Sequence, residues 1–317
     1  MISGKTNLKS NDDKRYQLLF LLQHGKAQWR PTPFLHAHPM SHSHQPLPPI
    51  AFIGGGNMAS AIIGGLIQQG LPASQIEVVE PFEPARAALL QGFGVSAQPT
   101  ATAALARAAL VVWAVKPQTF KDAAQQAAAH TQGALHLSVA AGIRSGSIAQ
   151  WLGSDRIVRA MPNTPALIAQ GMTGLYARAA VTADERTLVE QVVATTGAWL
   201  WLEQESLLDA VTALSGSGPA YVFYFLEAMT DAGEDMGLTR EQAHQLAVAT
   251  FAGASELARR SDEPPAVLRQ RVTSKGGTTH AAIESMEADD MAQRFMRALD
   301  AAEHRARELG DEFGATN

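Results

Sequence analysis

The residues best suited to chemistry form a glycine-rich turn, Gly54-Gly55-Gly56-Asn57-Met58-Ala59. Gly54, Gly56 and Ala59 follow the G-x-G-x-x-G/A pattern of dinucleotide-binding turns. The first glycine allows a tight turn, the second lets the backbone approach a pyrophosphate, and the alanine lets a helix pack on a strand. Free N–H groups at a helix start then attract the phosphates. The turn predicts a site for NADPH or NADH; the alternative is a glycine-rich turn without a ligand.

Such a turn must lie between a strand and a helix, and both are predicted here. An apolar run precedes it, and apolar residues at helical spacing follow it. Short apolar strands continue to alternate with helices, which predicts a doubly wound, mainly parallel sheet covered on both faces, as in Rossmann-like α/β domains. The expected strands are Ile50–Ile53, Ile76–Glu80, Leu110–Val115, Ala134–Val139, Ile157–Ala160, Met172–Tyr176 and Ala198–Trp201. The expected helices are Met58–Gln69, Pro84–Gln91, Thr100–Arg107, Thr119–His130, Ser145–Trp151 and Ala183–Ala194.

After about residue 205 the strand signals stop and the sequence becomes helical. A long helical region over Leu207–Met236 is interrupted by Ser215-Gly216-Ser217-Gly218-Pro219, and Thr239 with Gln242 forms a candidate capping box for the next helix. Further helices are expected from Pro264 and Pro265, over 277–287 and over 289–310. We therefore expect a Rossmann-like domain over 49–205 and an all-α domain over 206–314, whose apolar faces form a core or a subunit interface. The apolar residues that form these faces are Leu214, Tyr221, Phe225, Ala228 and Met229.

Ligands of a doubly wound sheet bind outside the carboxyl ends of its strands. Glu80 ends the second expected strand, and a carboxylate there can accept hydrogen bonds from the adenosine ribose and repel a 2′-phosphate. This favours NADH, although Arg86 nearby can accommodate the phosphate. The alternative is a solvated charge at a strand end.

Three further strand ends carry candidate cofactor contacts. Lys116 would face cofactor phosphates or ribose, or else be an ordinary surface lysine, while Pro117 can start a helix. The small residues after the next strand allow a flat nicotinamide ring to approach, and Asn163 and Thr164 can bond its carboxamide; the alternative is two tight turns. The predicted cofactor contacts are Ile53, Gly54, Gly55, Gly56, Asn57, Met58, Glu80, Ala114, Val115, Lys116, Pro117, Ala140, Ala141, Asn163 and Thr164.

A second candidate site is the segment Val272-Thr273-Ser274-Lys275-Gly276-Gly277-Thr278-Thr279-His280. Two glycines precede a new helix that begins with threonines, so consecutive N–H groups can form an anion nest. Hydroxyls of Ser274, Thr278 and Thr279 lie at the same place, which suits a small carboxylate. The alternative is a plain helix cap.

Composition limits the remaining possibilities. The chain has 317 residues, a net charge of −5 and no cysteine, which gives no nucleic-acid footprint and fits a cytoplasmic protein. No apolar run is long enough for a membrane span. Residues 1–48 differ from the rest and are expected to be a disordered tail or a gene-model extension with translation from Met40; a metal site at His36, His38, His42 and His44 is the less favoured alternative.

Taken in order, these segments resemble the pyrroline-5-carboxylate reductases over about residues 50–312. Two of the matching segments, Leu214–Tyr221 and Val272–Thr279, lie in the helical part and are more specific to this family than the glycine turn is. The matching segments are Phe52–Met58, Ala114–Pro117, Ser138–Ile143, Arg159–Pro165, Leu214–Tyr221 and Val272–Thr279.

The resemblance implies reduction of L-1-pyrroline-5-carboxylate to L-proline by NAD(P)H, the last step of proline biosynthesis. It also implies a homodimer, or an assembly of dimers, formed through the helical domain. By family position the nest holds the substrate carboxylate, and Thr279 bonds the ring nitrogen and relays a proton. The substrate contacts implied are Asp262, Val272, Ser274, Gly276, Gly277, Thr278 and Thr279. Two departures are Lys275, where relatives usually have proline, and Glu80, where many have Ser or Thr.

Two other functions remain as alternatives. A β-hydroxyacid dehydrogenase would use a helix lysine as acid and base, and no lysine lies between Ser215 and Arg240. A non-catalytic NAD-binding regulator would have no reason to keep a carboxylate nest in a separate domain. The reaction of the resemblance needs no metal and no cysteine nucleophile.

Overall fold

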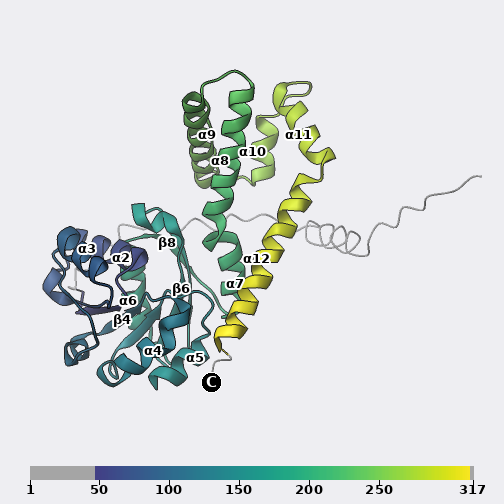
Figure 1. The fold of residues 1–317 in the computed structure, drawn as a ribbon. Helices are drawn as coiled ribbons and strands as arrows, with labels where there is room; N and C mark the ends of the chain where they lie inside the picture. The colour runs from purple at the N-terminus through teal and green to yellow at the C-terminus, as the bar shows by residue number, and fades with distance from the viewer. Residues whose placement is uncertain (1–46, 315–317) are drawn as a thin grey trace, which may run out of the picture. The chain divides into compact units, whose positions relative to one another are not determined.

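The computed structural model describes residues 47–314 and contains one eight-stranded sheet in the order β3-β2-β1-β4-β5-β6-β7-β8 (Figure 1). Neighbouring strands are parallel except β6 and β7, which are antiparallel. The predicted doubly wound, mainly parallel sheet is therefore confirmed. The strands are β1 (Ile50–Ile53), β2 (Ile76–Val79), β3 (Ala97–Gln98), β4 (Leu110–Trp113), β5 (Leu135–Ser138), β6 (Ile157–Met161), β7 (Gly171–Ala177) and β8 (Gly197–Trp201).

The register of the central strands brings their carboxyl ends together. Ile53 lies opposite Val79 of β2 on one side and Trp113 of β4 on the other. Trp113 in turn lies opposite Ser138 of β5. The loops after β1, β2, β4 and β5 therefore leave the sheet at one edge, where a doubly wound fold binds its ligand.

Helices cover both faces of the sheet, so β1 and β4 are buried throughout. On one face, Phe52 packs in a core with residues of α2 (Asn57–Gln68), α3 (Glu83–Phe93) and α6 (Ala183–Val193). On the other, Ala51 and Ile53 pack with residues of α4 (Pro117–Ala127) and α5 (Ser145–Leu152). Alternate side chains of one strand thus enter two cores, which explains why the strands are continuously apolar.

Only helices follow β8 within the described residues. They are α7 (Leu207–Val211), α8 (Gly218–Asp235), α9 (Arg240–Arg260), α10 (Pro265–Arg271), α11 (Thr278–Ala288) and α12 (Met291–Gly314). The expected interruption near Ser215 is a π-helical turn, Thr212–Gly216. The capping box is present, since Gln242 N–H donates to Thr239 Oγ1 and Thr239 N–H donates to Gln242 Oε1. None of the helices in residues 47–314 has the length and apolar character that a bilayer span requires.

Contacts divide the described chain into two compact units. One unit consists of residues 249–282, which include α10 and parts of α9 and α11. The other consists of residues 47–248 and 283–314, which include the sheet, α7, α8 and α12. The domain limits 49–205 and 206–314 stay a prediction, and the expectations for residues 1–46, including Met40 and the histidine cluster, lie outside the described residues.

Two local expectations differ from the structure, and one short strand was not expected. The segment Thr100–Arg107 was expected to be a full helix, but it forms only a short 3₁₀ helix, Ala103–Arg107, in which the Thr102 hydroxyl accepts the Ala104 N–H. Helix α4 begins at Pro117, which confirms the prediction that this proline can start a helix and places the start two residues before the expected range, because a proline at the first helical position lacks only an N–H that would be unpaired there. The unexpected strand is β3, which has only two residues and therefore too short a sequence to show an apolar pattern.

Candidate cofactor and substrate sites

The glycine turn fits tightly between the ends of three strands. Gly54 has a φ of +97°, and a Cβ there would lie 2.5 Å from the carbonyl oxygen of Ala114, which only glycine avoids. Its N–H donates to Val79 O at 2.8 Å, while Ala114 N–H donates to Ile53 O at 2.8 Å. The turn is thereby fixed to β2 and to the loop after β4.

Gly56 fits the predicted phosphate contact. It precedes α2, its side-chain position faces open space with no atom within 4 Å, and no side chain caps the helix. Asn57 and Met58 open the helix, and no acidic residue lies in its first turn. Ala59 is fully buried against the sheet, as the pattern requires. The exposed N–H groups and the positive end of the helix dipole suit a pyrophosphate.

Glu80 is held by two backbone groups at the edge of this turn. Its Oε2 accepts the Gly55 N–H at 2.7 Å and its Oε1 accepts the Phe82 N–H at 2.8 Å. The side chain is therefore not a freely solvated strand-end charge. Arg86 Nη1 donates to the carbonyl oxygens of Glu80 and Pro81, at 3.0 and 2.7 Å, which places a guanidinium beside the backbone of the same strand end. Both signs of charge thus lie where the adenosine ribose is expected.

The loop after β4 presents an exposed cation at the same edge. Ala114 and Val115 are half-buried, whereas Lys116 is exposed and occupies the N-cap position of α4 without a capping hydrogen bond from its side chain. The Thr119 N–H donates to Lys116 O at 3.0 Å, which fixes the backbone and leaves the ammonium in solvent. The structure therefore brings Lys116 to the ligand-binding edge of the sheet.

Asn163 makes internal hydrogen bonds with both ends of its amide. Its Oδ1 accepts the Met172 N–H at 2.9 Å, and its Nδ2 donates to the Ser215 hydroxyl at 3.2 Å. It ties the end of β6 to β7 and to the π-helical turn, and one amide hydrogen is left for a nicotinamide. Thr164 begins the 3₁₀ helix that follows.

The predicted nest lies in the unit of residues 249–282. Gly276 has a φ of +73°, and the Gly277 N–H donates to Ser274 O at 3.0 Å just before α11 begins at Thr278. A Cβ at Gly277 would lie 2.7 Å from Ser274 Oγ and 3.2 Å from Ser274 O, so a larger residue would displace the Ser274 hydroxyl and crowd the turn. The Thr279 hydroxyl belongs to the first turn of α11.

The other implied substrate contacts belong to the same unit. Asp262 lies between α9 and α10, and Val272 is exposed directly after α10. The neighbouring Glu263 accepts a hydrogen bond from Arg271 Nη2 at 2.6 Å, which ties the Asp262 segment to the end of α10. No group of three or more possible metal ligands occurs in residues 47–314.

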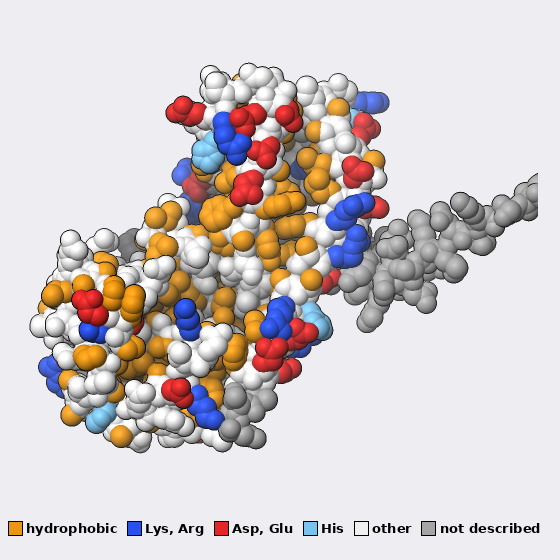
Figure 2. All heavy atoms as spheres, in the orientation of Figure 1, with side chains coloured by type: hydrophobic (Ala, Val, Ile, Leu, Met, Phe, Trp, Pro, Cys, Tyr) orange, Lys and Arg blue, Asp and Glu red, His pale blue; other side chains and the backbone are white. Residues whose placement is uncertain are grey.

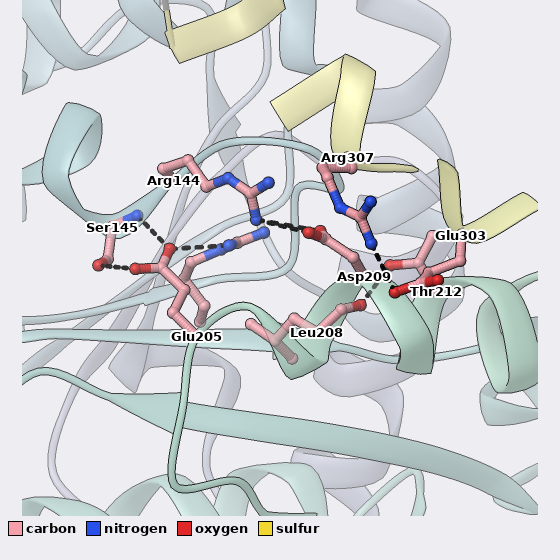
Figure 3. Close-up of polar contacts among 9 residues, drawn as sticks. Arg144, Ser145, Glu205, Leu208, Asp209, Thr212, Glu303 and Arg307 are labelled. Atoms are coloured by element: carbon pink, nitrogen blue, oxygen red, sulfur yellow. Dashed lines mark hydrogen bonds and ion pairs between the residues drawn. The ribbon is translucent and has the colours of Figure 1, made fainter. Parts of the chain in front are cut away.

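Sequence reasoning missed a buried polar cluster of Arg144, Ser145, Arg159, Glu205 and Asp209 (Figure 3). Glu205 Oε1 accepts the Ser145 N–H at 2.6 Å and Arg159 Nη1 at 2.8 Å, and Oε2 accepts the Ser145 hydroxyl at 2.5 Å. Burial opposes ionisation of Glu205, but the hydrogen bonds from Ser145 and the charge of Arg159 outweigh it and hold its pKa below the usual range. The available signal was an arginine within the apolar strand β6, which requires a buried partner.

Comparisons with known proteins agree with this architecture. A family model described as pyrroline-5-carboxylate reductase dimerisation matches residues 205–309, and one described as NADP oxidoreductase, coenzyme F420-dependent, matches residues 49–142. The pyrroline-5-carboxylate reductase of Pseudomonas aeruginosa is 47% identical over 269 residues, which cover 84% of this chain and 98% of the relative. The chain belongs to the pyrroline-5-carboxylate reductase family.

Solved structures of this family have the same fold. A pyrroline-5-carboxylate reductase from Coxiella burnetii matches with a TM-score of 0.78 and 38% identity, covering 83% of this chain and 99% of that one. The Plasmodium falciparum enzyme, solved with NADP bound, matches with a TM-score of 0.74 and 27% identity, covering 83% and 98%. The family membership and the fold read from the sequence are both confirmed.

Proposed function

We propose that the chain catalyses the reduction of L-1-pyrroline-5-carboxylate to L-proline with NADPH or NADH, the final step of proline biosynthesis. The observation that carries this function is the 47% identity to a pyrroline-5-carboxylate reductase over 98% of that protein's length. The glycine turn supports it, because Gly56 leaves open space beside the free N–H groups of α2.

The dinucleotide is held by the chain and supplies the hydride through its nicotinamide ring when bound. The N–H groups that follow Gly56 hold the pyrophosphate, and Glu80 and Arg86 face the adenosine ribose. Lys116 adds a positive charge for the phosphates. These residues bind and orient the cofactor, and the cyclic iminium substrate is itself a good hydride acceptor, so alignment is the main catalytic task.

The turn Ser274–Thr278 holds the substrate carboxylate in this proposal, and Asp262 and Val272 lie beside the ring. The Thr279 hydroxyl bonds the ring nitrogen and passes on its proton. The closure of Gly277 on Ser274 O supports the assignment because it fixes the turn directly before α11, whose first N–H groups have no partner within the helix and can attract an anion. Lys275, exposed in this turn, adds a positive charge that favours an anionic substrate.

The dimerisation domain acts as a homodimer or in an assembly of dimers. Large apolar side chains are exposed along α8 and α12, and Figure 2 shows hydrophobic side chains gathered over the helical part of the chain. Exposed apolar patches of this kind mark subunit interfaces. On α8 and α12 they are Val222, Phe223, Tyr224, Met229, Met291, Phe295 and Met296. A cytoplasmic location is part of the proposal, and a chain without cysteine is compatible with a reducing compartment.

The test is the loss of nicotinamide absorbance on adding L-1-pyrroline-5-carboxylate to the full chain, with NADPH and NADH in parallel. Turnover that requires the substrate is expected with at least one cofactor. Protein that binds NADPH but turns over neither cofactor would favour reduction of a different imine.

A further inference from the structure

The loop of residues 139–144 connects β5 to α5 and contains Ala140 and Ala141, two of the predicted nicotinamide contacts. Helix α12 packs directly on it. Gly142 has a φ of +73°, and a Cβ there would lie 3.2 Å from Phe313 Cδ2 and 3.3 Å from Leu309 Cβ. The last turns of α12 therefore contact the loop at Gly142 and support it there.

Arg144, at the end of this loop, joins it to two helices that follow the sheet domain. Its Nη1 lies 2.9 Å from Asp209 Oδ2 and 3.0 Å from Oδ1, and Asp209 belongs to α7. The guanidinium also lies flat on α12, because a Cβ added at Gly310 would lie 2.6 Å from Arg144 Nη2. Figure 3 shows the two side chains meeting between the loop and α7.

Glu205 makes a second connection, to the residue that directly follows the loop. It accepts both the backbone N–H and the hydroxyl of Ser145, the first residue of α5, and it is paired with Arg159 of β6. The side chains of Asp209 and Arg159 are each only 6% exposed, and each is paired with a partly exposed partner, Arg144 at 26% and Glu205 at 21%. An ion pair with one deeply buried partner favours one arrangement of the loop, since a shift would leave that buried charge unpaired.

The place of the loop in the sheet indicates which half of the cofactor it serves. In a doubly wound sheet the two halves of a dinucleotide bind on either side of the point where the strand order reverses, here between β1 and β4. Glu80 follows β2, on the adenosine side. The loop follows β5, on the other side, and so borders the nicotinamide half.

We propose that Arg144 and Asp209 are positioning residues for the nicotinamide half of the cofactor, because they fix the loop of residues 139–144 to α7 and α12. The pair touches no reacting atom and acts through Ala140 and Ala141. This inference rests on the proposed function for its site. It adds that the dimerisation helices control the geometry of hydride transfer from within the same chain.

The test compares Arg144→Met, Asp209→Asn and the double variant in the full chain. Arg144→Met leaves the buried Asp209 carboxylate unpaired, and Asp209→Asn leaves the charge of Arg144 uncompensated, so each is expected to lower the Tm, whereas the double variant removes both charges and is expected to regain most of that loss. The double variant is nevertheless expected to keep a kcat lowered on the order of 10²-fold, because a small misplacement of a reactant costs about this much.

Binding measurements separate positioning from general damage and need no substrate. 2′-Phospho-ADP-ribose, which lacks nicotinamide, is expected to bind the double variant as it binds the wild type. The nicotinamide fluorescence of bound NADPH is expected to change, because the ring environment is altered. These two readouts also keep the test valid if the wild type fails to reduce L-1-pyrroline-5-carboxylate, an outcome that would contradict only the proposed function.

A matched control is the pair of Arg156 and Glu185, which joins the start of β6 to α6 away from the loop. Arg156→Met with Glu185→Gln is expected to change the Tm without changing NADPH fluorescence. Gly310→Ala is a gentler probe, since its Cβ displaces the Arg144 guanidinium, and Gly92→Ala, whose Cβ meets no atom within 4 Å, is its control. The proposal is overturned if the double variant and Gly310→Ala keep wild-type kcat and fluorescence, or if fragment and dinucleotide binding weaken equally.

Discussion

At the scale of single residues, the proposed chemistry depends on two side chains. They are Glu80, beside the cofactor-binding turn, and Thr279, beside the nest. Glu80 is held by the N–H groups of Gly55 and Phe82, so its charge has a fixed place. Thr279 carries a hydroxyl in the first turn of α11, where a helix start favours an anionic ligand. The fixed charge of Glu80 should therefore affect which cofactor is preferred, whereas the Thr279 hydroxyl should affect the rate of turnover.

Glu80→Ser is expected to raise the ratio of kcat/KM for NADPH over NADH by roughly tenfold, because removing a carboxylate near the ribose removes a repulsion of about 1.4 kcal/mol with the 2′-phosphate. Glu80→Gln is the control, since its amide oxygen can still accept the Gly55 N–H without carrying charge. Both variants should move the ratio in the same direction. An unchanged ratio in both would mean that Glu80 does not face the ribose.

Thr279→Val is expected to lower kcat on the order of 10²-fold, because the shape is kept while the proton partner of the ring nitrogen is lost. Thr279→Ser keeps the hydroxyl and is expected to retain most of the activity. Steady-state kinetics with varied substrate would check both. A rise in KM alone would limit Thr279 to orienting the ring.

At the scale of elements, the strand pair β4 and β5 contains a buried histidine. Trp113 Nε1 donates to His136 Nδ1 at 3.2 Å, and the imidazole is 1% exposed. Burial, with a smaller contribution from the charge of Arg156, lowers the pKa of His136 from 6.5 to about 4. The imidazole is therefore neutral in the folded protein at neutral pH and serves as a hydrogen-bond acceptor between the strands.

This histidine predicts a loss of stability in acid. Below pH 6.5 the unfolded chain binds a proton at His136 that the folded chain does not bind until about pH 4. The free energy of unfolding should therefore fall as the pH drops across that window, by about 3 kcal/mol at most. Urea unfolding at several pH values would measure it. His136→Asn can still accept from Trp113 without titrating there and should flatten the dependence; parallel curves for both proteins would contradict this explanation.

The elements also show what the sequence could predict. Strand β1 occurs at its expected residues, and the Thr239 capping box forms, because both depend on neighbouring residues. The polar cluster could not be predicted in this way, since Glu205 is 60 residues from Ser145 and Asp209 is 65 from Arg144. Asn163 illustrates the same limit: its strand-end position was predicted, but its bond to Ser215 depends on a π-helical turn that packs against β6.

At the scale of the whole molecule, the isolated chain exposes large apolar side chains to water, which an interface with a second copy would cover. On α8, Phe223 is 58% and Tyr224 is 69% exposed, in a segment matched by the family's dimerisation model. Apolar residues buried at the centre of an interface commonly contribute about 2 kcal/mol or more each. A charge placed there must lose its hydration without gaining a partner.

Phe223→Glu combined with Tyr224→Glu is therefore expected to give a monomer at micromolar concentration, where we expect the wild type to form a dimer or larger assembly. Light scattering after gel filtration would measure the mass, and circular dichroism would show that the helices persist. Leu90→Glu is the matched control, because Leu90 is 57% exposed on α3 of the sheet domain and should leave the mass unchanged. If the monomer still reduces the substrate at the wild-type rate, each chain contains a complete active site, and the apolar face serves assembly alone.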